Sequence, residues 1–146
     1  MIFICGIDPG KQGGLAFKKG NEVKAISFTK LTKPEIAYTL KSIMPDKVYL
    51  EKVHSMPKQG VTSVFKFGEG FGHLKGVLDA LCIPYELVSP IKWQTKLSCR
   101  TGGDKNISKE KAQQLFPQVP KITHAVADAL LIMEYGFRQE AVKEIE

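Results

Sequence analysis

An acidic residue, Asp8, ends the first apolar run of the chain, which reads IFICGIDPG. The run is rich in β-branched and aromatic residues and is bounded by Pro9-Gly10, so it predicts a buried central strand followed by a tight turn. A lone carboxylate at the end of such a strand is costly to bury, and it needs a cation or a hydrogen-bonded partner. Further carboxylates arriving at the same place would form a divalent-metal site, and Glu51 and Asp128 are the two candidates.

The hydrophobic pattern predicts three opening strands and then helices alternating with two more strands. Thr32 and Glu35 have the spacing of a capping box, so a helix begins there, and Ser108 and Thr123 are the predicted caps of two later helices. The expected elements are strands 2–8, 13–18, 22–29, 47–53 and 84–90, and helices 33–44, 67–81, 108–116 and 124–145, with a loop over 99–107. This order is typical of a ribonuclease-H-like α/β domain, in which a mixed five-stranded sheet is flanked by helices.

Size and composition favour a single domain over residues 1–146, since 43% of the residues are hydrophobic. No signal-peptide pattern opens the chain, and no apolar stretch approaches the ~20 residues of a membrane helix, so we expect a cytoplasmic protein without membrane contact. The three cysteines are odd in number and lack CxxC spacing, which argues for a reduced compartment and against zinc.

The net charge of +6 favours an anionic partner. Basic residues outnumber acidic ones in two segments, which could equally be solvated surface faces. Those basic residues are Lys52, Lys58, Lys66 and Lys75, and then Lys92, Lys96, Arg100, Lys105, Lys109 and Lys111.

Glu51 and Asp128 lie in apolar surroundings, in VYLEKV and in the last helix. His124 precedes Asp128 by four residues, so both side chains project from one helix face. Each residue has a structural alternative: Glu51 on the surface of an edge strand, Asp128 paired with a lysine, and His124 as a polar core residue. Together with Asp8, however, the two carboxylates form a set of hard oxygen ligands that suits Mg²⁺ or Mn²⁺, and the histidine lies one turn away from it.

Such a set supports phosphodiester hydrolysis with two metal ions, which needs no side-chain nucleophile. The sequence contains neither a GxSxG motif nor a convincing Cys/His dyad. The predicted helix 67–81 also contains four glycines, each costing about 1 kcal/mol of helix propensity. They indicate close approach by the sheet, a partner subunit or a nucleic-acid strand.

Six segments in order resemble the RuvC-type Holliday junction resolvases, and most closely the short versions encoded by bacteriophages. They are GIDPG, YLEKV, HSMPKQGVTSVFKFGEGFGHLKGVL, VSPIKWQ, SKEKAQQLFP and HAVADALLIMEYG, and they extend from Ile2 to about Phe137. The resemblance implies a metal-dependent endonuclease that cuts four-way junctions and related branched DNA at symmetric positions.

The resemblance also implies site residues. Asp8, Glu51 and Asp128 match three of the family's four metal-binding acids, and His124 takes the place of the fourth, so all four are expected to be catalytic and to hold two Mg²⁺ ions, with Mn²⁺ as a substitute. The residues expected to contact DNA are Lys11, His54, Lys58, Lys92, Lys96 and Lys111. Family members are homodimers, which here implies an interface on helix 67–81, along Phe67, Phe71, Leu74 and Leu78.

Parts of the sequence also suggest two other functions. An ATP-binding actin-like fold also opens with GIDxG, but it needs two such domains and phosphate loops that this chain lacks. A catalytically impaired junction-binding or architectural protein stays open, because the fourth acid is replaced by His124.

Overall fold

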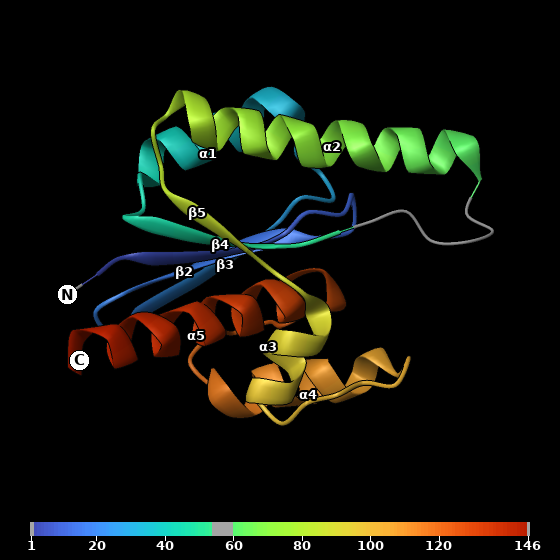
Figure 1. Cartoon of the computed structure of the whole chain (residues 1–146). Helices are drawn as coiled ribbons and strands as arrows, with labels where there is room; N and C mark the ends of the chain where they lie inside the picture. Colours follow the sequence, from blue (N-terminus) through green and yellow to red (C-terminus); the bar gives the residue numbers. More distant parts are fainter. Residues whose placement is uncertain (1, 54–59, 146) are drawn as a thin grey trace.

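Five strands form one mixed sheet in the order β3-β2-β1-β4-β5 in the computed structural model, which describes residues 2–53 and 60–145 (Figure 1). β1 pairs antiparallel with β2 and parallel with β4, β2 pairs antiparallel with β3, and β4 pairs parallel with β5. The strands are β1 Ile4–Asp8, β2 Gly14–Lys19, β3 Glu22–Ser27, β4 Lys47–Glu51 and β5 Tyr85–Val88. This topology confirms the predicted ribonuclease-H-like arrangement.

Helices cover both faces of the sheet (Figure 1). α1 (Lys33–Ile43) and α2 (Val61–Ala80) lie on one face, and α3 (Pro90–Lys96), α4 (Lys105–Leu115) and α5 (His124–Ile145) lie on the other. Each face has its own cluster of buried apolar side chains, since neighbouring residues of a strand point to opposite sides of the sheet. Within the described ranges 2–53 and 60–145, no helix is both long and apolar enough to cross a membrane.

Local sequence signals account for several element boundaries. The Thr32 hydroxyl accepts from the Glu35 backbone N–H at 3.2 Å, and the Glu35 carboxylate accepts from the Thr32 N–H at 2.9 Å. The predicted capping box is therefore confirmed, and so is the start of α5 directly after Thr123.

Three local predictions were wrong. α2 begins at Val61, six residues before the predicted start, and the unpredicted α3 follows β5 with Ser89 as its cap. α4 begins at Lys105, inside the predicted loop, because the Asp104 carboxylate caps it by accepting from the Asn106 N–H. Ser108 is consequently a buried residue of that helix and not its cap.

β1 and α5 approach each other closely at Gly6. A methyl group on Gly6 would meet the Met133 backbone nitrogen, and it would lie 2.7 Å from the Ala129 carbonyl oxygen. The helix backbone therefore lies directly on the strand, with the small Ala129 at the contact. Further along, Gly136 faces the ring of Tyr49 on β4 in the same way.

We predict that Gly6→Ala lowers the free energy of unfolding by about 3 kcal/mol, because backbone atoms on both sides must move to admit the methyl group. Urea unfolding followed by circular dichroism measures this change. Gly70→Ala is the matched control: its added methyl meets nothing within 4 Å. There the same substitution should stabilise α2 by about 0.5–1 kcal/mol. Equal stability of the Gly6→Ala variant and the wild type would contradict the close approach.

Candidate active site

Two carboxylates lie at the carboxyl ends of neighbouring parallel strands. Asp8 is the last residue of β1 and Glu51 the last of β4, and the register pairs Ile7 with Leu50 just before them. α5 crosses this end of the sheet and brings Asp128, one residue before the Ala129 contact with β1. The predicted convergence of these elements at one edge is therefore present in the fold.

A cavity of about 420 Å³ opens at this edge. Asp8 and Asp128 both line it, and Glu51 does not. The full lining is Asp8, Gly10, Gln12, Gly13, Lys105, Ser108, His124, Ala125 and Asp128. The cavity thus combines two of the predicted carboxylates and the predicted histidine with a lysine and a serine from α4.

Asp8 is held in an environment that disfavours its charge. Burial, followed by the nearby Asp128 carboxylate, raises the pKa of Asp8 from 3.8 to about 6. Two interactions oppose this rise: the Gly10 backbone N–H, 3.5 Å from Asp8 Oδ1, and the positive charge of Lys105. The carboxyl group is therefore readily stabilised by an added cation.

Glu51 is oriented by a tryptophan. Trp93 is fully buried on α3, and its indole Nε1 donates to Glu51 Oε2 at 2.8 Å. Burial and the Asp8 carboxylate raise the pKa of Glu51 to about 8, and the bond from Trp93 opposes that rise. Trp93 is therefore part of the core, and its contact with Glu51 was not predicted from the sequence.

Asp128 interacts with three polar residues around the cavity. Burial raises its pKa, while a hydrogen bond with Ser108, then the charge of Lys105, then His124 lower it. His124 itself is exposed, one turn before Asp128 at the start of α5. It lines the same cavity as Asp128.

Metal binding by this set stays a prediction. Among residues 2–53 and 60–145, no three His, Cys, Asp or Glu side chains already lie close enough together to hold one ion. Glu51 is turned to Trp93, outside the cavity. The donor types nevertheless fit Mg²⁺ or Mn²⁺, which prefer carboxylate oxygens. Neighbouring carboxylates also raise the pKa of Asp8 and of Glu51, and a bound cation would relieve this repulsion.

Lys105 and Ser108 are the site residues that sequence reasoning missed. The predicted helix start at Ser108 left Lys105 in a loop, so the two residues were not recognised as neighbours on one helix face. With the start at Asp104, Lys105, Ser108 and Ala112 follow the i, i+3, i+7 spacing of a single helix face. Ser108 and Ala112 are buried, so this face packs on the protein and directs Lys105 to the carboxylates.

The predicted DNA-contacting residues fall in different places. Lys11 is exposed in the β1–β2 turn, and Lys92 and Lys96 are exposed on α3. Lys111 is half-buried on α4, close to the buried Cys99. Burial raises the pKa of the Cys99 thiol, and the positive charge of Lys111 opposes that rise. His54 and Lys58 lie outside the described residues.

Solved structures with the same architecture include two junction resolvases. RuvC from Thermus thermophilus matches with a TM-score of 0.67 over 95% of this chain and 97% of its own, at 16% sequence identity. The T. thermophilus RuvC complex with a Holliday junction substrate gives a TM-score of 0.67 at 16% identity, over 95% and 96% of the two chains. The Holliday junction resolvase of fowlpox virus gives 0.57 at 17% identity, over 95% and 99%.

No model of a known protein family matches the chain, and no curated protein sequence matches it. At these identities the structural likeness shows the ribonuclease-H-like fold, in agreement with the strand order.

The raised pKa of Glu51 predicts a pH-dependent stability in the absence of divalent cations. Folded Glu51 keeps its proton up to about pH 8, whereas the unfolded chain releases it near 4.5, so stability falls as the pH rises through this window. Glu51→Gln keeps an acceptor for Trp93 and removes the titration. In EDTA, the free energy of unfolding of the Glu51→Gln variant should therefore fall less than that of the wild type between about pH 5 and about pH 8. The expected difference between the two proteins is on the order of 3 kcal/mol.

Urea unfolding at several pH values measures the difference. Glu110→Gln, an exposed carboxylate on α4, is the control and should follow the wild type. Parallel pH profiles of Glu51→Gln and wild type would contradict the burial of a titrating Glu51.

Proposed function

We propose that this protein is a metal-dependent endonuclease that resolves Holliday junctions and related branched DNA by hydrolysing phosphodiester bonds at symmetric positions. The observation that carries the proposal is that Asp8, Glu51 and Asp128 come together at one sheet edge beside the cation Lys105. Asp128 there raises the pKa of Asp8, and Asp8 and Asp128 both raise the pKa of Glu51. A ribonuclease-H-like fold shared with RuvC and the fowlpox virus resolvase supports the same activity. The bacteriophage subgroup, a cytoplasmic location and a single nuclease domain over 1–146 are inferred from the sequence alone.

Asp8, Glu51, His124 and Asp128 would hold two Mg²⁺ ions, for which Mn²⁺ would substitute. When bound, such ions activate the attacking water and stabilise the leaving 3′ oxygen. The carboxyl groups must release their protons to act as ligands, so the raised pKa values of Asp8 and Glu51 predict weaker metal binding in acid.

The chain's own residues contribute positioning and charge. Ser108 fixes the Asp128 carboxylate by a hydrogen bond, and Trp93 fixes Glu51 in the same way. Lys105 places a positive charge at the cavity, where it can attract a DNA phosphate to the carboxylates. The three residues are therefore expected to orient ligands and substrate.

DNA would approach from the side of the exposed lysines. Lys11 in the β1–β2 turn and Lys92 and Lys96 on α3 are exposed and available for phosphate contacts. Lys111 would contribute from α4, and His54 and Lys58 from the segment between β4 and α2.

We predict that Asp8→Asn abolishes cleavage of a synthetic four-way junction in Mg²⁺ and leaves junction binding within about twofold, since the substitution removes a ligand charge and keeps the shape of the side chain.

A second prediction concerns His124. His124→Ala should slow cleavage strongly, and His124→Asp should retain cleavage with Mg²⁺, because Asp is the usual residue at this position in the family that the chain resembles. Gel analysis of the nicked products, with anisotropy for binding, measures both effects.

Gln12→Ala is the matched control, because Gln12 lines the same cavity and has no assigned role. Wild-type rates in Asp8→Asn would refute the catalytic assignment. Tight junction binding by a wild-type protein that never cuts in Mg²⁺ or Mn²⁺ would establish the alternative, a junction-binding architectural protein.

Paired cuts require two active sites, so we propose a two-fold symmetric homodimer. The stripe expected to form its interface faces inward: Leu74 and Leu78 are buried, and Phe71 packs on the same core. The opposite face of α2 is open, and a methyl added at any of its glycines meets nothing within 4 Å. This open face follows helical spacing through Val61, Phe65, Gly68, Gly72 and Gly76.

Glycines spaced by four let two helix backbones approach closely, and the exposed Val61 and Phe65 add apolar area at one end. We therefore assign the dimer interface to the outer face of α2 and not to the stripe predicted from sequence. A second copy of this chain in an antiparallel arrangement would bury the same residues on both subunits.

Gly72→Leu tests this face. Gly72 is exposed and a Cβ added there meets nothing within 4 Å, so the variant should fold and should gain about 0.5–1 kcal/mol of helix propensity. We predict that it sediments as a monomer at micromolar concentration, where the wild type is a dimer, and that it makes single nicks in place of paired ones. Gln113→Leu, exposed on α4, adds the same side chain elsewhere and should remain dimeric. A dimeric Gly72→Leu would move the interface off this face.

A further inference from the structure

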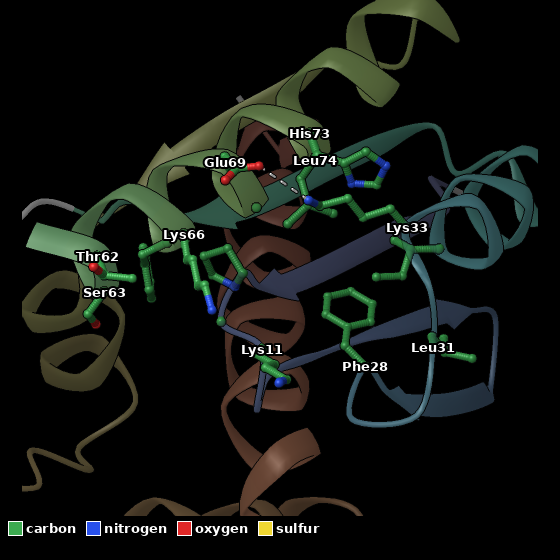
Figure 2. Close-up of a pocket in the computed structure, with 15 residues that line it drawn as sticks. Lys11, Phe28, Leu31, Lys33, Thr62, Ser63, Lys66, Glu69, His73 and Leu74 are labelled. Carbon is green, nitrogen blue, oxygen red and sulfur yellow. Dashed lines mark ion pairs between the residues drawn. The ribbon is translucent and has the colours of Figure 1, made fainter.

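A second and larger cavity, of about 840 Å³, shares a lining residue with the carboxylate cavity, and Figure 2 shows the side chains that line it. Residues from α1, α2 and the turn after β1 enclose it, and Gly10 of that turn lines both cavities. Its volume is within the ~300–1,000 Å³ of small-molecule sites. No predicted catalytic residue lines it, so its role is separate from the hydrolysis itself.

Three lysines surround this cavity. Lys33 reaches from α1 to Glu69 on α2, with 3.9 Å between Nζ and Oε2 (Figure 2). Lys11 and Lys66 extend into the space between α2 and the β1–β2 turn, and no carboxylate within residues 2–53 and 60–145 forms an ion pair with either. Two such lysines on opposite sides of one opening are suited to a phosphate group.

The interior of the cavity is apolar and aromatic. Phe28, Ile36 and Leu74 form a buried floor, and the ring of Phe67 is 37% exposed beside them. An exposed aromatic ring next to lysines is a surface on which a nucleic-acid base can stack. A purely electrostatic surface for duplex DNA would not need this apolar depth.

Polar groups at the rim complete the lining. Thr62 and Ser63 bring hydroxyl groups from the first turn of α2. Burial and then the charge of Lys33 lower the pKa of His73, so its imidazole is neutral at pH 7 and offers a hydrogen-bonding edge. Phosphate, base and hydrogen-bonding contacts are thus available within one cavity.

We propose that this cavity holds one unpaired nucleotide of a DNA strand, with its phosphate between Lys11 and Lys66 and its base against Phe67. The inference rests on the proposed function for the identity of the strand, which would run past Gly10 to the carboxylate cavity. The site would favour branched DNA because a nucleotide at a branch point unstacks and unpairs at a lower cost than one within a continuous duplex. A free mononucleotide has the same chemistry, and the test separates the two sources.

The probe is a DNA hairpin carrying one bulged 2-aminopurine nucleotide, compared with the same hairpin fully paired, in EDTA to prevent cleavage. Phe67→Ala should weaken binding of the bulged hairpin about tenfold and leave the paired hairpin within about twofold. Phe67→Trp should restore the affinity, because it restores the stacking surface. Lys66→Ala should lower the salt slope of log K for the bulged hairpin by about 0.7.

Lys41→Ala is the matched charge control, since Lys41 is exposed on α1 outside the cavity. It should not distinguish the two hairpins. Equal losses on bulged and paired DNA in Phe67→Ala, or no loss on either, would overturn the proposal. Tighter binding of deoxythymidine monophosphate than of the bulged hairpin would overturn the assignment to a DNA strand.

The two proposals fail separately. A wild-type protein that prefers the bulged hairpin and never cuts junctions refutes the nuclease and keeps the nucleotide site. A wild-type protein that cuts junctions, with unchanged hairpin selectivity in Phe67→Ala and Lys66→Ala, refutes the nucleotide site alone. Circular dichroism of each variant confirms folding, which is expected because neither side chain is fully buried.

Discussion

Helix α5 lies on β1 at Gly6, and the position of the acidic residues depends on this contact. Asp8 follows Gly6 by two residues on the strand, and Asp128 immediately precedes Ala129, whose carbonyl oxygen faces Gly6. A side chain at this point would push the helix away from the sheet and separate the two carboxylates. Packing at a single glycine therefore determines the electrostatics at the end of the sheet, where burial and proximity raise the pKa values.

Repulsion among the acids is only partly compensated inside the protein. The Gly10 N–H, the Trp93 indole and the Ser108 hydroxyl each stabilise one carboxylate, and Lys105 supplies a positive charge. These contacts leave the pKa of Glu51 near 8, so the compensation is incomplete. A site in this state would gain from binding multivalent cations, and this expectation is the physical basis for the proposed hydrolytic chemistry.

Sequence patterns predicted the sheet, and they singled out three acids that the fold brings to one end of it, because both follow from local features. Apolar runs with turn residues define the strands, and a carboxylate in an apolar run, as at Glu51, is conspicuous. Lys105 could not be found this way, since its role depends on how α4 packs on α5 and on a cap at Asp104 that competed with Ser108. The outward direction of Gly68, Gly72 and Gly76 was likewise undetermined, because glycine spacing alone does not say which face of α2 meets the sheet.

The turn between β1 and β2 links the two cavities physically. Its Gly13 N–H donates to the Gly10 carbonyl at 2.9 Å, and Gly13 lies so close to the Asp8 carbonyl that no side chain fits there. The turn is consequently tight and closed by a hydrogen bond, with Asp8 at its base and Lys11 at its tip. A phosphate bound by Lys11 would therefore lie at a fixed offset from the carboxylates. Such an offset would let recognition of a branch point in one cavity determine which phosphodiester bond reaches the other.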